Sequence, residues 1–350
     1  MQRITGKADR NGSFGHQKWV VAMTGHSPTA AEHQALMRQV LARQRPERLP
    51  CSTWRAVEYR PEVYHLGEMD HLPALGEVAA SDNGKRRFTR DGGVWAVGDP
   101  EVYRTHDDVL AATPEEFEVE SVGPAMLDAM AGMAAEAAKV SFVWPWHYGT
   151  LVTRATIEFG WEPFLVAAAL EPDRFGRLLD RFGEASLAVV EGWARTPGVE
   201  LVIVHDDIAA TRGPILSPEW LRRYAFPWYE RLFAAIHAAG KQALYISDGN
   251  YLPVLDDILS TGPDGLFIES SSMDPAEFMA RGGPDKLYLI KTDNRAMDVG
   301  TPQQVRAELR VLRDLHQQYP GMMIYRGGGN PTPVLAAAFD RAYQELLVYA

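Results

Sequence analysis

The chain has 350 residues, of which 46% are hydrophobic and 23% are charged, and its formal net charge at pH 7 is −11. This composition is typical of a globular protein with a large apolar core. An acidic chain without a basic run binds nucleic acid and anionic membranes poorly, so we expect neither as a partner.

Cysteine content and apolar runs indicate a cytoplasmic protein. Cys51 is the only cysteine, so no disulfide can form within the chain, and a reducing compartment fits best. The apolar runs are far shorter than the roughly 20 residues needed to span a bilayer. The charged N-terminus (MQRITGKADRNGSFGHQ) lacks the apolar core of a signal peptide.

The first 120 or so residues are irregular in pattern. We expect residues 1–40 to form an N-terminal extension and residues 80–100, which contain DNGKRRFTRDGGVWAVGDP, to form an inserted hairpin. Its basic cluster, Lys85 to Arg87, is either a solvated hairpin surface or a clamp for substrate carboxylates. No linker or repeat divides the chain, so we predict a single domain over residues 1–350.

From Ala125 onward one pattern recurs. An Ala/Met-rich helix (AMLDAMAGMAAEAAKV) precedes an apolar run, and further apolar runs follow, each ending in polar residues and followed by a helical segment. The runs are FVWPWH from Phe142, LVIVHDD from Leu201, QALYISDGN from Gln242, GLFIESS from Gly265, LYLIKTDNR from Leu287 and MMIYRGGGN from Met322. Runs that are apolar throughout favour parallel strands buried on both faces.

The segments between these runs carry helix start signals. Ser217-Pro218 is an N-cap followed by proline at the first helical position, and Pro227 should kink this helix. Thr301 begins a capping box, and Thr332-Pro333 begins the last helix. Strands alternating with helices predict a parallel sheet. We favour a (β/α)₈ TIM barrel over an open doubly wound sheet, because no dinucleotide fingerprint follows an early strand.

Active sites of such barrels lie at the carboxyl ends of the strands, where this chain places its polar residues. The candidate catalytic residues are His147, Asp206, Asp207, Asp248 and Glu269. The candidate substrate-binding residues are Trp144, His205, Tyr245, Ser247, Lys291, Asp293, Arg295, Arg326 and Asn330.

Each candidate also has a structural interpretation. Aspartates after strands often cap the next turn or helix. Strand alternation places His205 and Asp207 on one face and Asp206 on the other. Lys291 is a substrate-binding cation, a Schiff-base nucleophile or, as we favour, an ion-pair partner of Asp293 or Glu269.

The order of these motifs resembles the uroporphyrinogen decarboxylase superfamily, which also contains corrinoid-linked methyltransferases. The segment VHDDIAATRGPILSPEWLRRYAFPWYERLFAAIHAAGKQALYISDGNYLPVLDDILSTGPDGLFIES carries most of the resemblance, and RPERLP, RDGGVWAV, DVGTPQQV and GGGNPTPV extend it over residues 40–350. The resemblance implies a (β/α)₈ barrel with its site at the strand carboxyl ends, and a homodimer.

The chain departs from both branches of that superfamily. The zinc-dependent methyltransferases carry a His-x-Cys pair where this chain has Ile246-Ser247-Asp248, so a thiolate zinc site is excluded. A zinc site of His205, Asp207, Asp248 and Glu269 stays open. The decarboxylases carry a serine where Asp207 stands and a histidine where Gly328 stands. Haem biosynthesis is therefore not expected.

The sequence leaves several functions open. We favour a cofactor-independent lyase that decarboxylates an aromatic or heterocyclic small molecule by acid/base chemistry, with Lys291, Arg295 or Arg326 holding carboxylates. The main alternative is a corrinoid-dependent methyltransferase or O-demethylase with a carboxylate-bound metal and a corrinoid protein as partner. A Schiff-base aldolase through Lys291 and a catalytically silent ligand-binding barrel complete the alternatives.

Overall fold

The computed structural model describes residues 29–52, 63–67, 103–117, 122–139, 141–327 and 331–349. The parallel strands of the main sheet are β1 (Cys51–Ser52), β2 (Val63–Gly67), β3 (Phe142–Tyr148), β4 (Leu201–His205), β7 (Gln242–Ile246), β8 (Gly265–Glu269), β9 (Leu287–Lys291) and β10 (Met322–Tyr325). A small antiparallel hairpin consists of β5 (Ala209–Ala210) and β6 (Gly213–Pro214).

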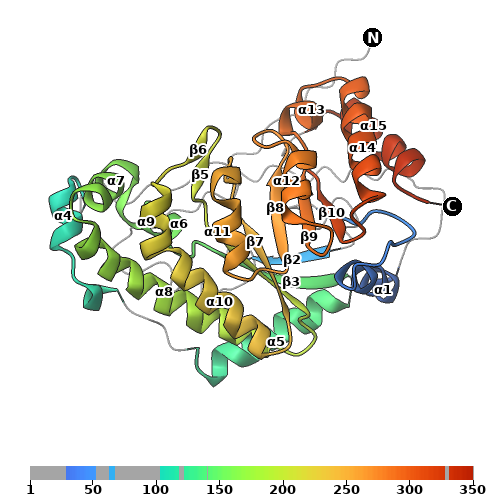
Figure 1. Ribbon diagram of the computed structural model, residues 1–350. Helices are drawn as coiled ribbons and strands as arrows, with labels where there is room; N and C mark the ends of the chain where they lie inside the picture. The colour runs from blue at the N-terminus through green and yellow to red at the C-terminus, as the bar shows by residue number, and fades with distance from the viewer. Residues whose placement is uncertain are drawn as a thin grey trace, which may run out of the picture.

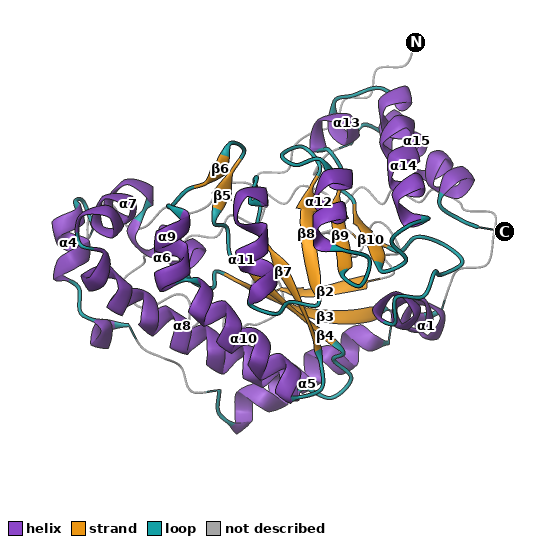
Figure 2. Ribbon diagram, viewed as in Figure 1, coloured by secondary structure: helices purple, strands orange, loops and turns teal. Residues whose placement is uncertain are grey.

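Helices connect the strands and lie around the sheet (Figures 1 and 2). They are α1 (Ala30–Leu41), α4 (His106–Ala111), α5 (Pro124–Ala138), α6 (Val152–Phe159), α7 (Trp161–Leu170), α8 (Pro172–Arg195), α9 (Pro218–Tyr224), α10 (Phe226–Ala238), α11 (Leu255–Ser260), α12 (Pro275–Gly282), α13 (Asn294–Asp298), α14 (Pro302–His316) and α15 (Pro333–Leu346), with 3₁₀ turns at Pro114–Glu116 and Leu252–Val254. Among the described residues, no helix carries an apolar stretch that could cross a bilayer.

The main sheet is curled, with its strands in the order β1-β10-β9-β8-β7-β4-β3-β2. The central strands share long parallel registers, as between β8 and β9 from Gly265↔Leu287 to Glu269↔Lys291. A single pair, Ser52↔Val63, joins β1 to β2. The α/β class and the parallel sheet expected from the sequence are confirmed, and the sheet is curled.

Alternate side chains of the strands form an apolar cluster inside the curl, which we call the inner cluster. It comprises Phe142, Trp144, Trp146, Tyr148, Leu201, Ile203, Leu244, Ile246, Phe267, Leu287, Leu289, Met323 and Tyr325, joined by Met37, Val40 and Leu41 of α1. The α1 residues cover the amino ends of the strands, where Gln34 also donates to the carbonyls of Ala138 and Ser141. One face of α1 therefore packs onto the core.

The helix signals in the sequence match the observed elements. Thr301 forms the capping box of α14, and Ser217 and Thr332 cap α9 and α15. Pro227, which lacks an N–H, separates α9 from α10 at Ala225. The predicted hairpin at 80–100, residues 1–28 of the predicted extension and Asn330 lie outside the described residues.

Candidate active site

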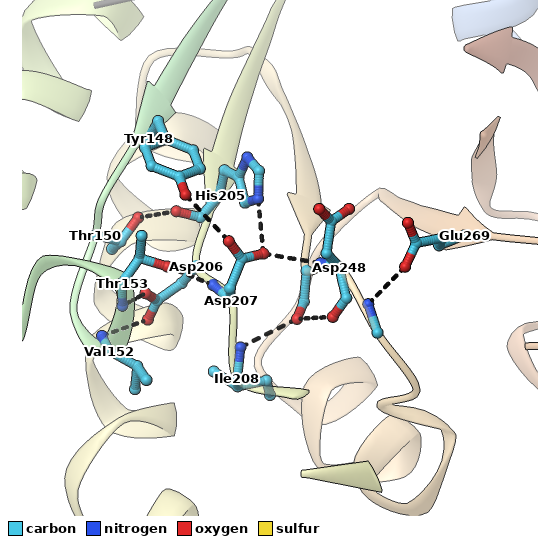
Figure 3. Close-up of polar contacts among 12 residues, drawn as sticks. Tyr148, Thr150, Val152, Thr153, His205, Asp206, Asp207, Ile208, Asp248 and Glu269 are labelled. Carbon is cyan, nitrogen blue, oxygen red and sulfur yellow. Dashed lines mark hydrogen bonds and ion pairs between the residues drawn. The ribbon is translucent and has the colours of Figure 1, made fainter. Parts of the chain in front are cut away.

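Polar side chains gather at the carboxyl ends of neighbouring strands, at one end of the inner cluster. Each of them continues the alternation of that cluster: Tyr148 follows Trp146, His205 follows Ile203, Asp248 follows Ile246, Glu269 follows Phe267 and Lys291 follows Leu289. We call this end of the sheet the mouth. Figure 3 shows its carboxylates, with that of Asp248 between those of Asp207 and Glu269.

His205 and Asp207 form a hydrogen-bonded pair, on one face as strand alternation predicts. His205 Nε2 lies 2.9 Å from Asp207 Oδ1, and Trp146 Nε1 donates to His205 Nδ1 over 2.8 Å. Because an indole nitrogen can only donate, Nδ1 must accept and the ring proton must lie on Nε2. The buried imidazole therefore donates to the carboxylate.

Asp207 is held by two further donors. The backbone N–H of Asp248 donates to its Oδ1 over 2.8 Å, and the Tyr148 hydroxyl donates to its Oδ2 over 3.2 Å. Burial acts to raise the pKa of Asp207, but the adjacent imidazole and the hydrogen bonds outweigh it and hold the pKa below its ordinary value. Asp207 is thus an oriented, ionised carboxylate.

Asp248 has a different environment. Its side chain is 48% exposed, against 23% for Asp207. Although half of this side chain is exposed, the surrounding protein removes much of the water near its carboxyl group, and this loss of hydration is the main cause of its raised pKa. The nearby carboxylate of Asp207 adds to the rise, and the cation of Lys291 opposes it. Two neighbouring carboxyl groups with opposite pKa shifts are suited to different roles in acid/base chemistry.

Lys291 forms an ion pair with Glu269, one of the two partners expected from the sequence. Its Nζ lies 2.7 Å from Glu269 Oε1 and 3.5 Å from Asp248 Oδ1. Burial lowers the pKa of Lys291, but the two carboxylates outweigh it and raise the pKa overall. Burial acts to raise the pKa of Glu269, but the Lys291 cation and the hydrogen bonds from Lys291, Gly249 and Ser272 together outweigh it and lower the pKa. Lys291 stays charged within the mouth.

A glycine turn brings Glu269 and Asp248 together. Gly249 has φ +77°, and its N–H donates to Glu269 Oε2 over 3.0 Å. A Cβ at this position would lie 2.5 Å from the carbonyl oxygen of Ala209 in the β5–β6 hairpin. Only glycine therefore fits between the hairpin and the mouth.

Asp206 lies outside the mouth and serves the start of α6. Its side chain is fully buried and accepts from the N–H groups of Leu151, Val152 and Thr153 over 2.7–3.2 Å. The Tyr229 hydroxyl also donates to it over 2.7 Å. Burial raises the pKa of Asp206, although these donors act in the opposite direction. Its contacts are those of a structural cap.

Several other candidates also lie away from the mouth. The Tyr245 hydroxyl donates to the Asp206 carbonyl, and Ser247 Oγ accepts from the N–H of Ile208. Strand alternation turns the side chain of His147 to the helix-facing side of the sheet.

The remaining candidates lie in the inner cluster, against α15 on the outside of the sheet, or on α13 at the rim of the mouth. Trp144 is buried in the inner cluster, deeper than Trp146. The Arg326 guanidinium lies over the ring of Phe339, 5.0 Å from its centre. Asp293 caps α13 through the N–H of Arg295, whose exposed side chain lies on the helix that follows β9.

Tyr148 and Trp146 belong to the site although sequence reasoning selected His147 from the same segment. The alternation that separates Asp206 from Asp207 also separates His147 from Trp146 and Tyr148. The apolar character of Phe142, Trp144 and Trp146 sets the inward parity of this strand. That signal was sufficient to find both residues.

The donor set expected for zinc does not fit a metal as the side chains are placed. Both ring nitrogens of His205 are hydrogen-bonded, and the Lys291 ammonium contacts Glu269 and approaches Asp248. Within the described part of the chain, no group of three or more His, Cys, Asp or Glu side chains is arranged to hold a metal ion.

Among solved structures similar to this chain, the first named here shows the fold. The chain is similar to a methyltransferase from Methanosarcina mazei, with 16% identity, a TM-score of 0.50 and coverage of 63% of this chain and 64% of that one. The chain thus spans less than two thirds of that protein. A 3-keto-D-glucoside 4-epimerase from E. coli aligns at 13% identity and TM-score 0.39, covering 63% of this chain and 83% of that one. Xylanase 10B from Thermotoga petrophila aligns at 12% and 0.44, covering 92% and 98%.

No curated protein matches the chain. The family described as uroporphyrinogen decarboxylase (URO-D) matches residues 144–325, which is 182 of the 350 residues. The matched part runs from β3 to β10 and contains every residue of the mouth described above. The chain belongs to the uroporphyrinogen decarboxylase family.

Proposed function

We propose that this protein is a (β/α)₈ barrel lyase that decarboxylates a carboxylated aromatic or heterocyclic small molecule by acid/base chemistry, without a cofactor. The observation that carries the proposal is the pair of unlike carboxyl groups in the mouth. Asp207 is oriented and ionised, whereas Asp248 is half-exposed with a raised pKa. Such a pair separates charge stabilisation from proton delivery.

The proposed reaction begins with the substrate ring in the mouth. Protonated Asp248 transfers its proton to the ring carbon that bears the carboxylate, which leaves a cationic ring. The bond between that carbon and the carboxylate then breaks, its electron pair returns to the ring and CO₂ leaves. The ionised Asp207 stabilises the cationic ring while it exists. Asp248 takes up a proton from solvent before the next cycle.

The electrostatics of the mouth support this sequence of steps. Three carboxyl groups, those of Asp207, Asp248 and Glu269, face one ammonium, that of Lys291. An acidic site favours a cationic intermediate over an anionic ground state. We assign the substrate carboxylate to Arg295 at the rim or to Lys291, because Arg326 packs against Phe339 instead.

Methyl transfer with a corrinoid protein as partner is the second candidate. It rests on the likeness to the Methanosarcina mazei methyltransferase, which shows the fold alone at 16% identity. Its metal would need donors that here contact Trp146 and Lys291. This places it behind decarboxylation.

The test is CO₂ release from a panel of aromatic and heteroaromatic carboxylic acids labelled with ¹³C at the carboxyl group. We expect turnover of at least one by chelator-treated protein, and a loss of about 10²–10³-fold in kcat for Asp248→Asn. Asp314→Asn, at an exposed acid on α14, is the matched control and should keep full turnover. Full turnover by Asp248→Asn would exclude Asp248 as the general acid.

A further inference from the structure

The carboxylates of Asp248 and Glu269 approach one cation, the ammonium of Lys291. We infer that Lys291 is the built-in counter-ion of the mouth and that it occupies the position a divalent metal would need between these two side chains. Loss of the ammonium would turn the mouth into a divalent-cation site. The inference extends the proposed metal-independent reaction, but it concerns metal binding and can fail separately from it.

The oxygen atoms that approach Lys291 are the ones available to a cation. Glu269 Oε2 accepts from the Gly249 N–H and the Ser272 hydroxyl, both over 3.0 Å, whereas Oε1 lies 2.7 Å from Lys291 Nζ. Asp248 Oδ1 lies 3.5 Å from the same nitrogen. Among the described residues, only Lys291 donates a hydrogen bond to Glu269 Oε1 and to Asp248 Oδ1.

The ammonium is fixed in this place. Its side chain is 13% exposed, and that of Glu269 is 15% exposed, so both charges are largely removed from water. Breaking a pair of this kind by removing one partner leaves the other charge uncompensated. Lys291 starts from β9 and Glu269 from the paired position of β8, so the backbone register itself sets the contact.

A divalent ion and this ammonium cannot share the position. Hard divalent cations bind carboxylate oxygens at about 2.0–2.6 Å and accept one or two carboxylates with water as the other ligands. The Lys291 Nζ already lies against one such oxygen, and its positive charge repels a second cation. A neutral side chain at residue 291 would remove both obstacles. The carboxyl groups of Asp248 and Glu269 could then hold the ion, and Asp248 would release its proton on binding.

The experiment is a titration of the full-length, chelator-treated protein with Mn²⁺, followed by the electron paramagnetic resonance signal of the free ion. We expect wild type to bind Mn²⁺ at the mouth only weakly. Lys291→Met should bind one ion per chain with affinity at least about tenfold higher than wild type, because one opposing charge is gone. Lys291→Arg, which keeps the charge, is the matched control and should behave as wild type.

The double variant Lys291→Met with Glu269→Gln locates the site and should lose the gained binding. Folding is checked by circular dichroism, and Lys291→Gln serves as a second neutral variant. Folded neutral variants that bind Mn²⁺ no more tightly than wild type would overturn the inference. The inference would also be overturned if the wild-type protein bound one Mn²⁺ tightly and lost this binding in Glu269→Gln. This second test does not depend on whether the Lys291 variants fold.

Discussion

Replacement of Asp206 by alanine tests the division between structural and functional aspartates in the HDD segment. The carboxylate accepts from three backbone N–H groups at the start of α6 and from the Tyr229 hydroxyl. All of these lie in a buried environment where the Asp206 side chain itself has no exposed surface. The substitution therefore leaves four donors without their acceptor.

The expected cost follows from those four donors. A buried donor without a partner costs about 1–3 kcal/mol, and water entering the space left by the carboxylate would satisfy part of the set. We expect Asp206→Ala to lower the free energy of unfolding by about 4 kcal/mol, a value in the exceptional range for one substitution. Tyr229→Phe, which removes one donor and leaves the other three in place, should cost about 1–2 kcal/mol.

Equilibrium unfolding in urea measures both variants, with Asp314→Asn as a surface control that should stay within about 0.5 kcal/mol of wild type. A loss below about 1 kcal/mol for Asp206→Ala would refute the capping role. Loss of turnover at unchanged stability would return Asp206 to the catalytic set.

Three further outcomes are expected. Gly249→Ala should cost about 2–3 kcal/mol in urea unfolding, because φ +77° strains alanine and its Cβ would meet the Ala209 carbonyl; an unchanged midpoint would contradict this. Arg43 donates to the carbonyls of Asp285 and Asp264 at the amino ends of the strands, so Arg43→Ala should lower the free energy of unfolding by about 2–3 kcal/mol and leave turnover intact. Altered turnover in a stable variant would contradict this structural role. The pKa of Asp248 is raised, and its protonated form is the one that reacts. We therefore expect kcat to be full at low pH and to fall as the pH rises through that pKa. A kcat that rises over the same range would exclude Asp248 as the acid.

The strands of the second half were predictable because each is a short run of apolar residues between helix signals. The runs from Phe142, Leu201 and Met322 all became strands of the one sheet. Their order in the sheet, with successive strands from β3 to β10 as neighbours, is that of the barrel favoured over a doubly wound sheet.

The site was predictable where strand parity was used and missed where it was not. Parity correctly paired His205 with Asp207. The same parity in β3 turns His147 away from the mouth and Tyr148 into it, so His147 was the wrong candidate from this segment and Tyr148 was missed. Opposite charges at the ends of two strands also predicted an ion pair of Lys291, and Glu269 is one of the two partners expected.

Contacts made across the fold could not be predicted. Nothing near Asp206 in the sequence shows that its partners lie at the start of α6, more than fifty residues away. The same holds for Arg326, whose ring partner Phe339 comes from α15. The sequence gives no sign of the structural partners of such side chains, because these partners come from distant segments. The side chains therefore resemble site residues.

The measurement that tests the central proposal most directly is CO₂ release by chelator-treated wild type and Asp248→Asn on the same ¹³C-labelled carboxylic acids. The account predicts release by wild type without added metal, and release reduced about 10²–10³-fold in the variant. Release that depends on added divalent metal, or that persists unchanged in Asp248→Asn, would contradict it.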